Sequence, residues 1–214
     1  MNASRKNRSF ALSLAALAGL SVILQCWLSM QLAIHNGRSI GAGLATFFSY
    51  FTVLTNTSIF VSLTLSLIGP ASSAGKWCAR PGVVAGIAAN IAFVGLSYHF
   101  LLRNTWNPQG AQLLADLLLH YAVPAVYVLY WWSDAAKTAL RWTHPLLWSI
   151  YPAAYLAYSL VRGYLVGSYP YPFIDAGHIG YARTMLNAVG LLIVFIVLGL
   201  LLVALGRVRH RIGR

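Results

Sequence analysis

The chain has 214 residues, of which 59% are hydrophobic and only 8% are charged, and its mean hydropathy is +0.69. Because roughly a quarter of the residues in a soluble globular domain are charged, this composition excludes such a domain and predicts an integral membrane protein. The net charge of +12 does not indicate nucleic-acid binding, since the basic residues cluster at the ends of apolar segments.

Apolar segments follow one another along the chain, each near the ~20 residues that a membrane-spanning helix needs. We place six of them, at residues 10–34, 45–68, 82–102, 113–132, 145–165 and 183–206. The first follows a basic start but lacks a small-residue cleavage site, so we interpret it as a retained span and not a signal peptide. Because the connections are short, we expect one all-α bundle of antiparallel helices with no separate soluble domain.

Lysine and arginine predict the orientation of the bundle. The N-terminus, the second and fourth connections and the C-terminus together carry eleven of them, whereas the opposite side carries four: Arg38, Arg103, Arg162 and Arg183. Positive charge is retained on the cytoplasmic side. Both termini are therefore predicted to be cytoplasmic, in the plasma membrane (the bacterial inner membrane).

Polar residues gather in the outer halves of the predicted spans. Ser49, Thr52 and Asn56 share one face of the second helix, and Asp116 and His120 share one face of the fourth. With the termini inside, Thr52 and His120 both lie about seven residues, or ~10 Å, below the outer surface. Ionisable groups at such depth are costly and usually face a protein interior or a wet cavity. We therefore expect an outward-opening polar pocket.

The longest connection, residues 166–182 (VGSYPYPFIDAGHIGYA), lies on the predicted outer side. Pro170 and Pro172 stiffen it and remove two backbone donors. Its aromatic residues suit an anchor at the membrane interface. The alternative is a lid over the pocket that presents Asp175 and His178 downward.

Two further patterns concern helix packing and shape. Gly82 and Gly86 form a G-x-x-x-G spacing that favours close helix packing. Pro124 and Pro152 fall inside predicted helices and are expected to kink them.

A hydroxyl and an imidazole at one depth are compatible with nucleophilic catalysis. Thr52 would be the nucleophile, His120 its general base, and Asp116 the group that orients the imidazole. By depth, the nearest oxyanion donors are Asn56 and Asn187. Further polar groups on the outer side that could bind substrate are Arg162, Asp175 and His178. The competing interpretation is purely structural: an Asp–His pair that links two helices, and a threonine bonded to its own backbone.

Other functions remain open at this point. His35, His99, His120 and His178 all lie on the outer side, and imidazole binds zinc and haem iron. No H-x-x-x-H pattern accompanies them, the two cysteines are too few for a thiolate site, and no cofactor is predicted. A transporter usually has broken helices near the midplane and repeat symmetry, which are not evident. A non-catalytic lipid-binding or small-molecule transport protein stays the main alternative.

Four strings occur in the order YFTVLTN (50–56), HYAVP (120–124), Tyr151-Pro152 with Tyr155, and YPYPFID (169–175). Together they resemble the bacterial Pr-six-Pr family of six-span membrane proteins, which is similar to the eukaryotic androgen-induced, FAR-17a-like membrane proteins. Those relatives are threonine hydrolases of fatty acid esters of hydroxy fatty acids. The resemblance implies that Thr52 matches their nucleophile and His120 their histidine, although Pro124 follows His120 by one residue fewer than in the family string. It implies a lipid-like ester as substrate, drawn from the membrane.

Overall fold

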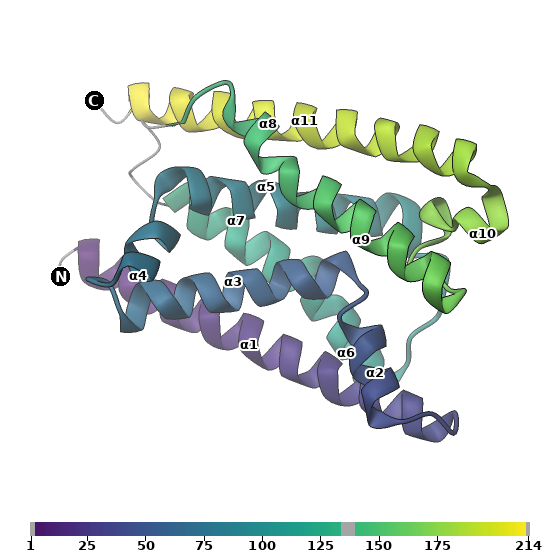
Figure 1. The fold of residues 1–214 in the computed structure, drawn as a ribbon. Coiled ribbons are helices and arrows are strands. Elements are labelled where there is room, and N and C mark those ends of the chain that lie inside the picture. The colour runs from purple at the N-terminus through teal and green to yellow at the C-terminus, as the bar shows by residue number, and fades with distance from the viewer. Residues whose placement is uncertain (1–2, 134–139, 213–214) are drawn as a thin grey trace.

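Figure 1 shows the computed structural model, which describes residues 3–133 and 140–212. The described residues form helices joined by short connections and contain no strand. In chain order the elements are α1 (Ala3–His35), α2 (Ile40–Phe47), α3 (Phe51–Ile68), α4 (Ser73–Cys78), α5 (Pro81–Ser97), η1 (Tyr98–Leu102), α6 (Gly110–Leu117), η2 (Leu118–Ala122), α7 (Val123–Ser133), α8 (His144–Trp148), α9 (Ile150–Val166), η4 (Pro172–Ile174), α10 (Ala176–Ile179) and α11 (Tyr181–Ile212).

Among the described residues, five helical stretches are long and apolar enough to cross a membrane. They are Asn7–His35, Phe51–Ile68, Pro81–Leu102, Gly110–Ser133 and Tyr181–Arg209. The prediction of an all-α fold is confirmed for the described residues, and these five helices are its candidate membrane spans. The segment predicted at 145–165 is divided at Ser149 into α8 and the 17-residue α9, and a sixth crossing stays a prediction. Of the charged residues, Asp134, Lys137 and Arg214 lie outside the described residues.

Both chain ends and α4 lie at one end of the bundle, on the left in Figure 1. The helices α2 and α10 lie at the other end, where α3 begins and where α6 follows the connection from η1. Lys76 and Arg80, in and after α4, therefore share an end of the molecule with the two termini.

The predicted helix at 45–68 is interrupted, which corrects one expectation. The chain breaks at Phe48–Tyr50, so Ser49 precedes α3 and does not share its face with Thr52 and Asn56. The break leaves backbone carbonyls without helical partners, and two tyrosines of α9 satisfy them. Tyr155 donates to the Ser49 carbonyl at 2.8 Å and Tyr158 to the Phe48 carbonyl at 3.3 Å.

The two predicted proline kinks differ in the structure. Pro124 follows the π-helical turn η2. In a regular α-helix the proline ring would clash with the carbonyl four positions earlier, and the wider π-helical turn relieves this clash. Pro152 is the third residue of α9, where the missing N–H costs little because first-turn N–H groups have no helical acceptor. The chain breaks before it, at Ser149.

The core centres on α5, which presents small residues to its neighbours. Ala85, Ala88 and Ala89 are fully buried. A Cβ added at Gly86 would lie 2.7 Å from Cδ1 of Trp148, and the Trp148 indole donates to the Gly82 carbonyl at 2.9 Å. The close packing predicted for the G-x-x-x-G spacing is confirmed, and its partner is α8.

Candidate functional site

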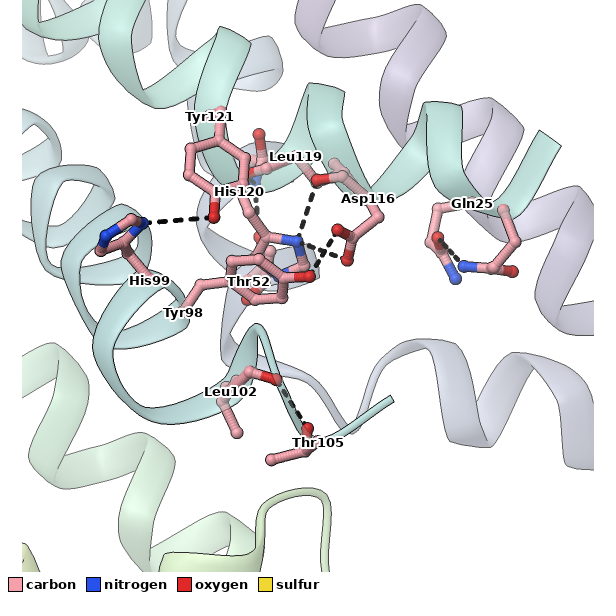
Figure 2. Close-up of polar contacts among 12 residues, drawn as sticks. Gln25, Thr52, Tyr98, His99, Leu102, Thr105, Asp116, Leu119, His120 and Tyr121 are labelled. Atoms are coloured by element: carbon pink, nitrogen blue, oxygen red, sulfur yellow. Dashed lines mark hydrogen bonds and ion pairs between the residues drawn. The ribbon is translucent and has the colours of Figure 1, made fainter. Parts of the chain in front are cut away.

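Asp116 of α6 and His120 of η2 lie in contact, as their spacing predicts (Figure 2). His120 Nδ1 is 3.0 Å from the Asp116 carbonyl oxygen and 3.2 Å from Asp116 Oδ1. The carbonyl makes the hydrogen bond, whereas Oδ1 lies within ion-pair distance but has no hydrogen-bond partner in the described part of the chain. Because both neighbours of Nδ1 are acceptors, we assign the imidazole proton to Nδ1, which leaves Nε2 as the basic nitrogen.

Tyr98, the first residue of η1, holds this pair from the other side. Its hydroxyl donates to Asp116 Oδ2 at 2.5 Å, and its ring stacks on His120 with centroids 3.8 Å apart and planes at 15° (Figure 2). Asp116 and Tyr98 are 3% and 5% exposed. Stacking on Tyr98 therefore fixes the plane of the imidazole ring, and the buried Asp116 is held in place as its partner. Tyr98 and His120 both belong to π-helical turns, which recur at functional sites.

Thr52 is the second residue of α3 and is buried. Thr55, Thr57 and Ser58 each donate to the carbonyl four residues earlier, at 2.8, 2.8 and 2.9 Å. Thr52 makes no such bond to its own helix within the described residues. Its hydroxyl lies 3.5 Å from the Tyr171 hydroxyl, and its backbone N–H donates to the same oxygen at 3.4 Å. The structural interpretation of a self-bonded threonine therefore fits Thr55 and not Thr52.

Two cavities meet at Thr52. The first, called here the polar cavity, has a volume of about 390 Å³ and is lined by Thr52, Asp116, His120, Gln25 and Gln112 among others. The second, called the apolar cavity, has a volume of about 220 Å³ and lies among α5, α9 and α11. Four residues line both: Thr52, Tyr98, Leu102 and Tyr171.

The polar cavity opens at the end of the bundle opposite the chain termini. Four of its exposed lining residues belong to connections at that end: Asn36, Arg38, Thr105 and Trp106. Gln112 donates to Gln25, which also lines the cavity, at 3.2 Å. The cavity thus brings Thr52 and His120 to one space that solvent can reach.

The connection between α9 and α11 covers part of this space. Pro170, Tyr171 and Pro172 line the polar cavity, and Tyr171 stacks on Phe173 with centroids 5.3 Å apart. Burial raises the pKa of Tyr171 to about 12, although its contacts with Thr52 act in the opposite direction. The phenol therefore keeps its proton near neutral pH. Of the two interpretations of this segment, a cover over the pocket fits these contacts, and Tyr171 is the residue that provides it.

The predicted oxyanion donors are committed elsewhere. Asn56 Nδ2 donates to the Thr52 carbonyl at 2.8 Å and to the Leu119 carbonyl at 3.2 Å, which ties α3 to η2. Asn187 Nδ2 donates to the Phe173 carbonyl at 2.9 Å. Neither residue lines either cavity. Asn56 and Asn187 thus position the loop and the helices around the site, and do not point their N–H groups into it.

The structure does not bring the remaining predicted residues to the cavities. Arg162 donates to the Ser168 carbonyl at 3.0 Å. Asp175 caps α10 by accepting from the His178 backbone N–H at 3.1 Å, and the His178 side chain is exposed. The cap turns the Asp175 carboxylate toward its own helix end, and not downward as a lid would require.

Metal-binding chemistry was one of the alternatives from the sequence. Within residues 3–133 and 140–212, no three His, Cys, Asp or Glu side chains lie close enough together to hold one ion. His35, His99, His120 and His178 therefore do not converge on a shared site.

Tyr98 and Tyr171 are site residues that sequence patterns did not assign. Tyr171 belongs to the YPYPFID string, which the sequence singles out, but its contact with Thr52 joins residues 119 positions apart. Tyr98 contacts Asp116 across the connection between η1 and α6. Contacts of this range follow from tertiary packing and carry no spacing signal.

No protein-family model, no curated protein and no solved structure matches this chain. The resemblance to the Pr-six-Pr family therefore stays a hypothesis that rests on the four strings.

Proposed function

We propose that the protein is a membrane hydrolase of lipid-like esters, with Thr52 as nucleophile and His120 as its base. One observation carries the proposal: Thr52 lies where the polar cavity, which holds the Asp116–His120 pair, meets the apolar cavity. A lipid ester has the same division, with one polar reacting group beside a long apolar chain. The resemblance to threonine hydrolases points to the same chemistry.

In the proposed reaction, Thr52 Oγ1 attacks the ester carbonyl carbon and passes its proton to His120 Nε2. The Asp116 carbonyl, which accepts from Nδ1–H, and the charge of its carboxylate 3.2 Å from Nδ1 stabilise the resulting imidazolium, the part that a triad's carboxylate plays. The imidazolium then gives the proton to the departing alcohol, which leaves an acyl-threonine. Water attacks this intermediate, Nε2 takes a proton from the water, and Thr52 recovers that proton as the acid departs.

The negative oxygen of each tetrahedral intermediate needs preorganised donors. The Thr52 backbone N–H belongs to the first turn of α3, where N–H groups lack helical acceptors and the helix dipole favours negative charge. Tyr171 adds a neutral hydroxyl 3.4 Å from that nitrogen. We assign the two as oxyanion donors in place of Asn56 and Asn187, whose amide N–H groups bind carbonyls. On substrate binding the Thr52 N–H exchanges its long 3.4 Å bond to Tyr171 for the oxyanion.

The proposed topology has six spans, with α8 and α9 forming the fifth, and both termini cytoplasmic in the plasma membrane. The eleven-to-four division of lysine and arginine supports it. In this orientation the polar cavity opens outward and the reacting groups lie within the outer leaflet.

The test combines labelling by a fluorophosphonate probe with turnover of a chromogenic fatty acyl ester, using the purified full chain. Thr52→Ala should abolish both, and Thr52→Ser should retain part of the turnover. Thr55→Ala is the matched control, because Thr55 is also buried on the same helix but bonds the Phe51 carbonyl at 2.8 Å. Full turnover by a folded Thr52→Ala protein would reject Thr52 as the nucleophile.

The second candidate is a non-catalytic lipid-binding or transport protein, favoured by the presence of an apolar cavity open to the outside of the bundle. It predicts a wild-type protein that binds lipid but is neither labelled nor able to hydrolyse esters. It also predicts that His120→Ala lowers the yield of folded protein, because Asp116 would lose the ionic partner of Oδ1.

A further inference from the structure

The apolar cavity has a wall suited to hydrocarbon. It is lined by Phe93 and Val94 of α5, Leu156 of α9, and Leu192 and Phe195 of α11, among others. In the described chain its polar lining groups are limited to Thr52, Ser97 and the hydroxyls of three tyrosines. A ligand that fills it must therefore be almost wholly apolar, because buried polar groups without partners are costly.

This cavity opens on the side of the bundle. Ala153 of α9 lines it and is exposed, as are Met185 and Val189 of α11, which are 39% and 54% exposed. Phe195 is fully buried at its inner wall. The outer surface of α11 beside the opening carries further exposed apolar residues, including Leu186 and Ile193. In a membrane the opening between α9 and α11 would thus face lipid tails and not water.

The inner end of the same cavity reaches the reacting groups. Thr52 and Tyr171 line it, and so does Tyr98, which stacks on His120. A chain that enters between α9 and α11 therefore ends beside the Thr52 hydroxyl.

We propose that the apolar cavity is the binding site of an acyl chain that enters sideways from the membrane between α9 and α11. The chain's carbonyl carbon lies at Thr52, and the alcohol part of the ester occupies the polar cavity. The orientation of the ester rests on the proposed hydrolase function, whereas occupancy by an acyl chain does not.

Adjacent alanines on α9 provide a matched pair of variants. Ala153 and Ala154 are both exposed, but only Ala153 lines the apolar cavity. Ala153→Trp should fill the opening, and Ala154→Trp should add the same side chain to the lipid-facing surface. Ala188→Leu, which narrows the cavity from α11, replaces Ala153→Trp if that protein fails to fold.

The first measurement is photo-crosslinking by a fatty acid that carries a diazirine on its chain, mapped by mass spectrometry. Wild type and Ala154→Trp should be crosslinked on α9 and α11 at cavity-lining residues, and Ala153→Trp should lose this labelling. Crosslinks confined to other faces of the bundle, or unchanged in Ala153→Trp, would overturn the acyl site.

The second measurement compares turnover of a dodecanoyl and a butyryl ester. Ala153→Trp should lower the ratio of long-chain to short-chain turnover about tenfold or more, since even one methylene in an apolar pocket changes selectivity by that order. Ala154→Trp should leave the ratio unchanged. Turnover with identical ratios in both variants would reject the acyl site but keep the hydrolase. Cavity crosslinks without turnover by the wild type would keep the acyl site and reject the hydrolase.

Discussion

The phenol oxygen of Tyr171 lies 3.4 Å from the backbone nitrogen of Thr52, although 119 positions separate the two residues. The contact joins the first turn of α3 to the connection between α9 and α11. Since Tyr171 also stacks on Phe173, whose carbonyl accepts from Asn187, the connection is fixed at both the site and α11. The Thr52 hydroxyl and the segment that covers it are therefore one structural unit.

Removing only the Tyr171 hydroxyl should distinguish the proposed catalytic role of the hydroxyl from the packing role of the ring. Tyr171→Phe keeps the ring on Phe173, so we expect KM to change little and kcat to fall about 10²-fold, as for the loss of one oxyanion donor. Steady-state kinetics on the chromogenic ester measure both. Tyr158→Phe is the control, because its hydroxyl binds the Phe48 carbonyl away from the cavities. Equal losses in the two variants would point to packing alone.

Asp116→Asn should be milder than removal of Thr52 or His120. The amide still fills the space beside Tyr98, but it stabilises the imidazolium less. Removing the orienting carboxylate of a triad lowers kcat about 10²-fold less than removing the nucleophile or the base does. Single-turnover rates of the three variants test this order. A double Thr52→Ala, His120→Ala variant should lose little more than either single variant, because the two act as a unit. Additive losses would contradict a shared step.

Reporter fusions at the two termini should both read cytoplasmic. The expectation follows from the clustering of Lys and Arg at the chain termini, at Lys76 and at Arg80, all at one end of the bundle. A single cysteine introduced at exposed Gly177 should react with an impermeant thiol reagent from outside, in a variant with Cys26 and Cys78 removed. A C-terminus outside the cytoplasm together with a cytoplasmic N-terminus would show that α8 and α9 do not cross, and would move Thr52 relative to the membrane surfaces.

The sequence alone predicts the helices well because long apolar runs have few other ways to satisfy their backbone in lipid. It predicts their interruptions poorly. The break at Phe48–Tyr50 has no proline or glycine to mark it, and depends on hydroxyls from Tyr155 and Tyr158. Of the two π-helical turns in the described part of the chain, only η2 has a visible cause, in Pro124.

For the site too, the sequence predicts local contacts but not the contacts that tertiary packing makes. The Asp116–His120 contact follows from a spacing of four on one helical stretch and is confirmed. The amide bonds of Asn56 and Asn187 depend on carbonyls of Leu119 and Phe173, which only the folded chain brings near. The sequence predicts how deep in the membrane such side chains lie, but it does not predict which neighbouring groups they contact.

The contact between Gly86 and Trp148 yields a prediction about stability that is independent of function. A Cβ at Gly86 would lie 2.7 Å from Cδ1 of Trp148, so Gly86→Ala must displace an indole that is hydrogen-bonded to the Gly82 carbonyl. Overpacking of this kind costs about 1–3 kcal/mol, and we expect a lower midpoint of thermal unfolding in detergent.

Gly190→Ala is the matched control for that measurement. A Cβ at Gly190, also in a helix interior, would have no heavy atom within 4 Å, so its thermal midpoint should stay the same or rise, because alanine favours helix over glycine by about 1 kcal/mol. Trp148→Phe should then rescue Gly86→Ala in part, since the smaller ring leaves room for the added methyl group. If Gly86→Ala is as stable as Gly190→Ala, α8 does not pack on α5 as described, and the support that this packing gives to a span formed by α8 and α9 is lost with it.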